Sequence, residues 1–190
     1  MNDNVKDVGV LLNRDKMKLL EHTGNEKLWL FSPSVFRLYP KSGNMHEMGI
    51  KQTLRFLLML IHGYRVYVMT DENDVVKGSI TYQRGGSYRY PFARKTDIID
   101  GPSYTVPKFR GQGVAVRIAE RAMNEYEKSD VCYGTIQKDN YSSLKRTEKS
   151  DFKKVGKLRV DIFKRFINDP EGNIVLVAHY NRVNGGDNFQ

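Results

Sequence analysis

The sequence predicts an α/β fold with a mixed, mostly antiparallel central sheet, one parallel strand pair and helices on both faces. Three observations predict it. The segment 97–137 reads as strand, helix and strand, and a βαβ unit of this kind makes its two strands parallel. Turn signatures join the other neighbouring β-rich runs, which is typical of antiparallel hairpins. Two amphipathic helical patterns lie between strands in the second half of the chain.

The bulk properties favour one ordinary globular domain over residues 1–190. The chain has 190 residues, of which 39% are hydrophobic and 28% charged. Its single cysteine, Cys132, excludes an internal disulfide and favours a reducing, cytoplasmic location. The N-terminus lacks a signal-peptide layout, and the most apolar window, 56–61, is too short to cross a bilayer. We therefore expect a cytoplasmic protein that does not enter membranes.

The charge balance leaves the partner open. The 31 Lys and Arg residues outnumber the 22 Asp and Glu residues, so that the formal net charge is +9. This excess fits nucleic acid, an acidic membrane face or a phosphorylated small molecule, or it serves solubility alone.

The first half of the chain contains both helical and extended patterns. A helix is expected over 15–22, extended chain over 28–31 and 35–39 on either side of Pro33, and a helix over 48–62. Residues 65–70 and 75–84 form a hairpin signature, followed by a basic, aromatic loop over 85–95. The helix over 48–62 is expected to place one set of apolar residues on a single face: Ile50, Leu54, Leu57, Leu58 and Ile61.

The second half is more regular. A strand over 97–106 contains Gly101 and Pro102, which predict a bulge or an edge position. A helix is expected over 113–128, a buried strand over 131–137, and a short helix over 140–149. Two strands, 157–167 and 173–180, are expected to be joined by the turn sequence NDPEGN.

The loop VPKFRGQGVA, residues 106–115, has the composition of an anion-binding loop. From Thr105 to Arg117 there is no acidic residue, although most helix starts carry one. Gly111 and Gly113 remove Cβ atoms that would keep an anion away from the backbone N–H groups. The spacing fits neither the dinucleotide fingerprint nor the nucleoside-triphosphate loop. An ordinary basic turn is the alternative interpretation.

The segment Arg110-Gly111-Gln112-Gly113-Val114-Ala115 resembles the Arg/Gln-x-x-Gly-x-Gly/Ala signature of the GNAT (Gcn5-related N-acetyltransferase) superfamily. Downstream, Asn140 and Phe152 have the spacing that is usual in this family. The resemblance covers 97–156 well and 64–84 and 157–180 moderately. It implies a GNAT-like domain with a variable acceptor-side region over 1–63, a CoA-binding core over 97–156 and a C-terminal strand pair over 157–182.

The resemblance also implies a site for acetyl-CoA as acyl donor, between two splayed parallel strands. Backbone N–H groups from Gln112 to Ala115 would hold the pyrophosphate, and the strand at Tyr104–Val106 would pair with the pantetheine arm. Asn140, helped by Ser143, would contact the cofactor arm or cap its helix. The residues implied to bind the cofactor are Tyr104, Thr105, Val106, Arg110, Gly111, Gln112, Gly113, Val114, Ala115, Asn140 and Ser143. Lys108 and Arg117 would meet the ribose phosphate or remain solvated.

The chemistry that the resemblance implies is direct attack of a primary amine, on a small molecule or amino sugar, on the thioester. A backbone N–H near Val106 would hold the oxyanion. Asp100 is the first choice for the base, with a turn-forming Asp as the alternative. Thr147 stands where the family has an acidic tyrosine, so Tyr141 is the nearest phenol for the acid.

Two other functions stay open on the sequence: a CoA-binding protein without catalysis, and a basic nucleic-acid-binding module. The expected partners are acetyl-CoA and an amine acceptor, with neither nucleic acid nor membrane. A homodimer is left open. His22, His46 and His62 show no metal-ligand spacing, and His179 is expected to be a core or edge residue.

Overall fold

In the computed structural model, residues 11–40, 50–126 and 129–180 are described. Their strands form one nine-stranded sheet in the order β1-β2-β3-β4-β5-β6-β9-β7-β8. In chain order the elements are β1 (Met17–Thr23), β2 (Glu26–Phe31), α1 (Ile50–Ile61), β3 (Arg65–Asp71), β4 (Val76–Arg84), β5 (Ile98–Thr105), η1 (Pro107–Phe109), α2 (Val114–Met123), η2 (Asn124–Tyr126), β6 (Val131–Gln137), α3 (Tyr141–Lys149), β7 (Lys153–Val160), β8 (Phe166–Asn168) and β9 (Ile174–Tyr180).

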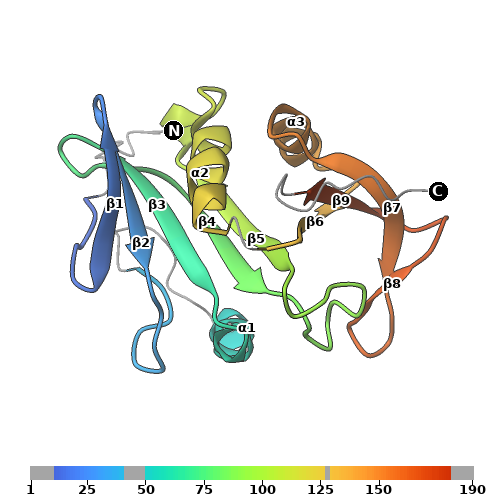
Figure 1. Ribbon diagram of the computed structural model, residues 1–190. Helices are drawn as coiled ribbons and strands as arrows, with labels where there is room; N and C mark the ends of the chain where they lie inside the picture. Colours follow the sequence, from blue (N-terminus) through green and yellow to red (C-terminus); the bar gives the residue numbers. More distant parts are fainter. Residues whose placement is uncertain (1–10, 41–49, 127–128, 181–190) are drawn as a thin grey trace, which may run out of the picture.

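The sheet has the predicted mixture of strand directions. β5 and β6 are parallel, and every other adjacent pair is antiparallel. Figure 1 shows α2 and α3 on one side of the sheet and α1 on the other, so the expected helices on both faces are confirmed. No helix in the described ranges has the length and apolar character needed to cross a membrane.

The core lies mainly between the sheet and α2. Ile118, Ala119 and Ala122 are buried on the predicted apolar face of α2 and pack against strand residues such as Tyr67 and Tyr82. A second cluster lies under α1, and a third joins the loop after β4 to the C-terminal strands. Fully burying a side chain such as that of Ile118 contributes roughly 1.5–3 kcal/mol to the free energy of folding.

The bulge predicted at Gly101-Pro102 is present. Asp100 pairs with Tyr82 and Ser103 pairs with Ile80, so β5 carries one more residue than β4 between these two pairs. The bulge interrupts the β4–β5 ladder where Pro102 has no N–H to donate.

Three predicted elements are wrong. Residues 15–22 are not helical, because Met17–Thr23 pairs with β2 as a hairpin strand. Residues 35–39 form no strand beyond an isolated bridge between Ser34 and Arg37. The expected strand over 157–167 is a hairpin of β7 and β8, and Asp161 forms its turn by accepting the N–H groups of Phe163 and Arg165.

The helix expected over 48–62 is present as α1, with residues 48–49 outside the described ranges. The residues that this helix buries are not those of the predicted apolar face. The helix buries Phe56 and Met59, whereas the predicted apolar set is exposed: Ile50, Leu54, Leu57, Leu58 and Ile61. The end predicted for α2, residues 127–128, also lies outside the described ranges.

Candidate active site

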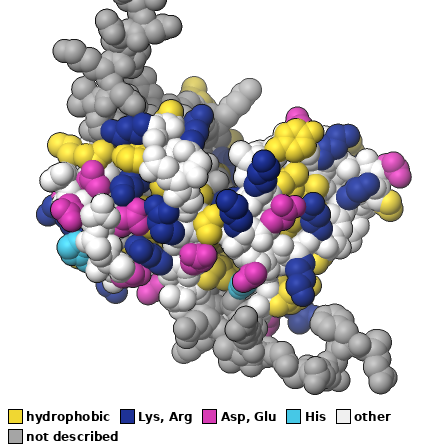
Figure 2. Space-filling view, turned by 90° about the horizontal axis from the view of Figure 1, so that it is seen from above, with side chains coloured by type: hydrophobic (Ala, Val, Ile, Leu, Met, Phe, Trp, Pro, Cys, Tyr) yellow, Lys and Arg dark blue, Asp and Glu magenta, His cyan; other side chains and the backbone are white. Residues whose placement is uncertain are grey.

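A cleft opens where the two parallel strands separate. Residues 98–100 of β5 pair with 132–134 of β6, and beyond these pairs the two strands continue without pairing to each other. The chain leaves β5 toward α2 and β6 toward α3, so both helices begin beside the opening. The cleft has a volume of about 580 Å³. Figure 2 looks down on this end of the molecule and shows Lys and Arg side chains on both of its halves.

The loop before α2 leaves a helix start open on one wall of the cleft. Gly113 is the N-cap residue of α2 and has φ 72°, a left-handed conformation that favours glycine. Gly111 has φ 77°. No side chain caps the helix, and its first turn contains no acidic residue. The backbone N–H groups and the positive end of the helix dipole are therefore available to an anion.

Arg117 connects this loop to β2 through hydrogen bonds. Its Nη1 donates to the Gln112 carbonyl at 2.6 Å, and its Nε and Nη2 donate to the Glu26 carboxylate at 2.9 and 2.8 Å. Lys77 donates to the same carboxylate at 2.9 Å. Burial raises the pKa of Glu26, but the hydrogen bonds and charges of Arg117 and Lys77 outweigh it, so the net pKa is lowered. Arg117 is thus engaged away from the cleft, and neither it nor Lys108 is among the lining residues.

Basic side chains line the cleft, and one of them, Arg146, is paired with the buried carboxylate of Asp100. Four basic residues line it, and none of its lining residues in the described part of the chain is Asp or Glu. The four are Arg110, Lys145, Arg146 and Lys149. The Nε of Arg110 donates to the Thr105 carbonyl at 3.3 Å, which holds its side chain against the strand. This lining favours a multiply charged anionic ligand.

All of the cofactor-binding residues expected from the sequence line the cleft except Val106 and Gln112. The Val106 N–H donates to the Lys77 carbonyl at 3.0 Å. It is therefore not free to hold an oxyanion, so the donor expected near Val106 is not the N–H of Val106 itself. Because successive strand residues direct their backbone groups to opposite sides, the groups of Thr105 face the split instead. The Gln112 side chain donates to the Lys108 carbonyl at 2.9 Å, outside the cleft.

The start of α3 forms the opposite wall. The Asn140 Oδ1 accepts the Ser143 N–H at 3.2 Å and the Ser142 hydroxyl at 3.1 Å, so Asn140 caps the helix while it lines the cleft. Thr147 is buried, and its hydroxyl donates to the Leu144 carbonyl at 2.8 Å. Tyr141 is 72% exposed and is not among the lining residues. The structure therefore brings neither the hydroxyl of Thr147 nor the phenol of Tyr141 into the cleft.

Asp100 lies at the closed end of the split, in a buried ion pair. Its Oδ2 accepts from Arg146 of α3, and the two side chains are 3% and 11% exposed. The Oδ1 atom has no hydrogen-bond partner among the described residues. Burial raises the pKa of Asp100, and the charge of Arg146 partly offsets this rise.

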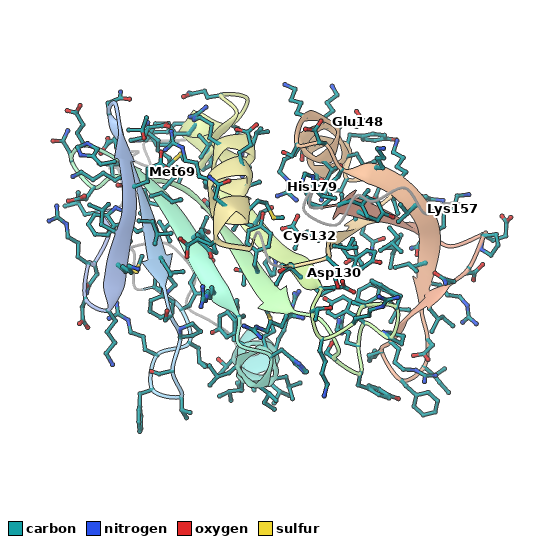
Figure 3. The ribbon with its side chains drawn as sticks, viewed as in Figure 1. Met69, Asp130, Cys132, Glu148, Lys157 and His179 are labelled. Atoms are coloured by element: carbon teal, nitrogen blue, oxygen red, sulfur yellow. The ribbon has the colours of Figure 1, made fainter. Side chains whose placement is uncertain are left out.

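Two residues near this pair behave as the sequence predicts. Cys132 is fully buried, and burial, together with the charge of Asp100, raises the pKa of its thiol. His179 is its cross-strand partner, half-buried, with its ring 5.4 Å from that of Phe152. Figure 3 labels Cys132 and His179 on β6 and β9. Their environments are those of core and edge residues.

The sequence interpretation missed the basic face of α3. Ser142, Lys145, Arg146 and Lys149 all line the cleft and follow one another at helical spacing. This spacing, on a helix that begins at the Asn140 cap, is a signal that could have identified them. Ser103 of β5 was also missed, because an exposed strand residue beside a proline carries no distinctive pattern.

No family model matches the chain, and no curated protein matches it. Solved structures do match. The ribosomal L7/L12 α-N-protein acetyltransferase RimL is similar with a TM-score of 0.57 at 12% identity, over 86% of this chain and 98% of that one. The ribosomal-protein-S5-alanine acetyltransferase from Vibrio fischeri gives 0.54 at 14% identity, over 88% and 97%. The protein yncA from Salmonella typhimurium, solved with its cofactor acetyl-CoA, gives 0.51 at 16%, over 72% and 75%.

These similarities define the fold. The chain has the fold of the GNAT acetyltransferases, as the signature at 110–115 and the order of elements led us to expect.

Proposed function

We propose that the protein is an acetyl-CoA-dependent N-acetyltransferase that transfers an acetyl group to a primary amine. The observation that carries the proposal is the cleft between β5 and β6, with an uncapped helix start on one wall and basic side chains on both. CoA carries a pyrophosphate and a ribose phosphate, and an uncapped helix start surrounded by cations suits such a ligand. The fold shared with acetyltransferases supports the same ligand.

Different residues of the cleft bind different parts of acetyl-CoA in this proposal. Backbone N–H groups at Gly113, Val114 and Ala115 hold the pyrophosphate, with Arg110 and Lys145 adding charge. The backbone of Thr105, whose carbonyl also accepts from Arg110, pairs with the pantetheine arm, because β6 has diverged from β5 there. The thioester then lies toward the closed end of the split.

The transfer step uses the Asp100–Arg146 pair. The amine nitrogen attacks the thioester carbonyl carbon, the C–S bond breaks, and the CoA thiolate leaves. Asp100 is the proposed base, because its Oδ1 is unengaged by the described residues and burial raises its pKa. The Arg146 guanidinium stabilises the thiolate by its charge, since an arginine does not give up its proton. The thiolate takes its proton from solvent.

The proposed acceptor is the amine of a small molecule or an amino sugar. Titration calorimetry with acetyl-CoA tests the first half of the proposal, and thiol release over a panel of amines tests the second. The panel contains simple amines, an amino sugar, a polyamine and a peptide with a free N-terminus. We expect a dissociation constant between about 1 μM and 1 mM and thiol release with at least one amine.

The outcomes separate the alternatives. Binding without thiol release with any amine would identify a CoA-binding protein without catalysis. This alternative has a basis in the structure, because Tyr104 is the one residue with a phenol among the described residues that line the cleft. No heat of binding up to about 1 mM acetyl-CoA would contradict both functions.

A further inference from the structure

A second hollow lies on the sheet face opposite the cleft, between α1 and the segment that follows β4. Figure 1 shows α1 on this face, beside the loop that joins β4 to β5. The hollow has a volume of about 430 Å³, within the range of small-molecule pockets. We call it the α1 groove, and its lining residues include Leu54, Leu58, Ile61, Gln83, Ser87 and Tyr88.

The walls of the α1 groove are apolar and open to solvent. Leu54 and Leu58 are each 58% exposed, Ile61 is 79% exposed, and Tyr88 across the groove is 66% exposed. These leucines and the isoleucine belong to the apolar set that the sequence predicted to lie on a single face of the helix. Their clustering beside a hollow indicates a surface that gains stability when an apolar ligand covers it.

Two buried polar atoms at the α1 groove are left without partners. Gln83 is 4% exposed and Ser87 is 7% exposed, and both line the groove. The Gln83 Oε1 and the Ser87 Oγ have no hydrogen-bond partner among the described residues. An amide oxygen can only accept, so the group that satisfies Gln83 must carry an N–H or O–H. Buried polar atoms are nearly always paired, and because Gln83 and Ser87 line the same groove, one ligand bound there can pair with both.

The charges around the α1 groove all have one sign. Arg55 and Arg89 line it, and its described lining residues include no Asp or Glu. The Arg89 guanidinium lies 4.8 Å from the centre of the Phe166 ring, which steadies its side chain at the rim. This electrostatic environment disfavours a polyamine and favours a carboxylate.

We propose that the α1 groove binds a small amphipathic carboxylate with an apolar body and a hydrogen-bond donor. The donor pairs with Gln83 and Ser87, the apolar body covers Leu54, Leu58 and Tyr88, and the carboxylate meets the arginines at the rim. An N-acylated apolar amino acid combines these three features, since its amide N–H is the donor. The site is distinct from the acetyl-CoA cleft, because the two lie on opposite faces of the sheet. Its lining includes α1 residues of the region 1–63 that the resemblance assigns to the acceptor side, and the test below measures binding of a ligand without an amine, apart from acetyl transfer.

The test is calorimetric titration of the full chain with N-acetyl-L-phenylalanine, which has no free amine and is not an acetyl acceptor. The matched ligand, N-acetyl-L-phenylalaninamide, lacks only the charge. We expect the acid to bind and the amide to bind about tenfold or more weakly, because a charge-assisted hydrogen bond is lost. Arg89→Gln should remove most of this preference for the acid.

Two variants locate the binding. Gln83→Met keeps the size of the side chain and removes the acceptor, so we expect it to weaken binding about fivefold or more. Leu58→Glu places a negative charge on an exposed wall, where folding is little affected, and should abolish binding of the acid. Thermal melting confirms that each variant is folded.

Two results would overturn the proposal. One is no binding of the acid up to about 1 mM. The other is equal affinity of wild type and Leu58→Glu, which would show that the acid binds elsewhere.

Discussion

Replacing Arg146 by methionine should expose how strongly the closed end of the split depends on its ion pair. Methionine retains most of the apolar stem and removes the charge, which leaves the Asp100 carboxylate buried without its partner. The two side chains are 3% and 11% exposed, so solvent cannot replace the lost interaction. Removing one partner of a buried pair costs about 3–5 kcal/mol in the free energy of unfolding.

The pH dependence of the Arg146→Met variant carries a definite sign. Burial already raises the pKa of Asp100, and without the charge of Arg146 it rises further. A carboxyl whose pKa is raised in the folded state stabilises the fold when protonated and loses that contribution as pH rises through the folded value. The deficit of the variant should therefore shrink as pH falls, and Asp100→Asn in the same chain should recover much of it.

Urea denaturation of wild type, the single variant and the double variant at neutral and mildly acidic pH measures these quantities. The single tryptophan, Trp29, is buried and reports unfolding by fluorescence. A deficit below about 1 kcal/mol at every pH, or a double variant no more stable than Arg146→Met, would refute the reasoning.

Three further outcomes follow from individual contacts. Glu26 has a lowered pKa, so its contribution to stability is present above the ordinary carboxyl range and disappears as pH falls through the folded pKa. The free energy of unfolding, measured by urea denaturation across this pH range, should therefore depend less on pH in Glu26→Gln than in wild type. Gly134→Ala places a Cβ 2.8 Å from a methyl group of Val177 and should cost about 1–3 kcal/mol, with a smaller cost in a Val177→Ala background, by thermal melts. Arg110→Gln should weaken acetyl-CoA binding about tenfold and reduce its salt dependence in calorimetry, whereas Arg159→Gln, 55% exposed on β7, should change neither.

The parallel strand pair and α2 could be predicted because local pattern and tertiary burial agree there. Ile118 and Ala122 recur at helical spacing and are buried, and Gly101-Pro102 marks a bulge that the ladder contains. Most of the expected cofactor-binding residues line the cleft for the same reason. Their positions follow from the turn chemistry of a short, continuous loop and from one helix cap.

The incorrect predictions concern features that depend on distant partners. Met17–Thr23 has helix-like spacing, yet pairing with β2 decides its conformation. The apolar stripe of α1 contains Leu54 and Leu58, but Phe56 and Met59 fit the space beneath β3 and β4. Two contacts that no prediction named also join segments far apart in sequence. The Val106 N–H donates to the Lys77 carbonyl, and Asp100 pairs with Arg146; no local pattern signals either contact.

The most direct test of the central claim is a titration of isotopically labelled protein with acetyl-CoA, followed by amide NMR shifts. The account predicts that the largest changes fall on the backbone amides of Gly111, Gly113, Val114 and Ala115, with smaller changes at Thr105. Saturable shifts confined to other surfaces, with these amides unmoved, would contradict the assignment of the cleft between β5 and β6 as the acetyl-CoA site.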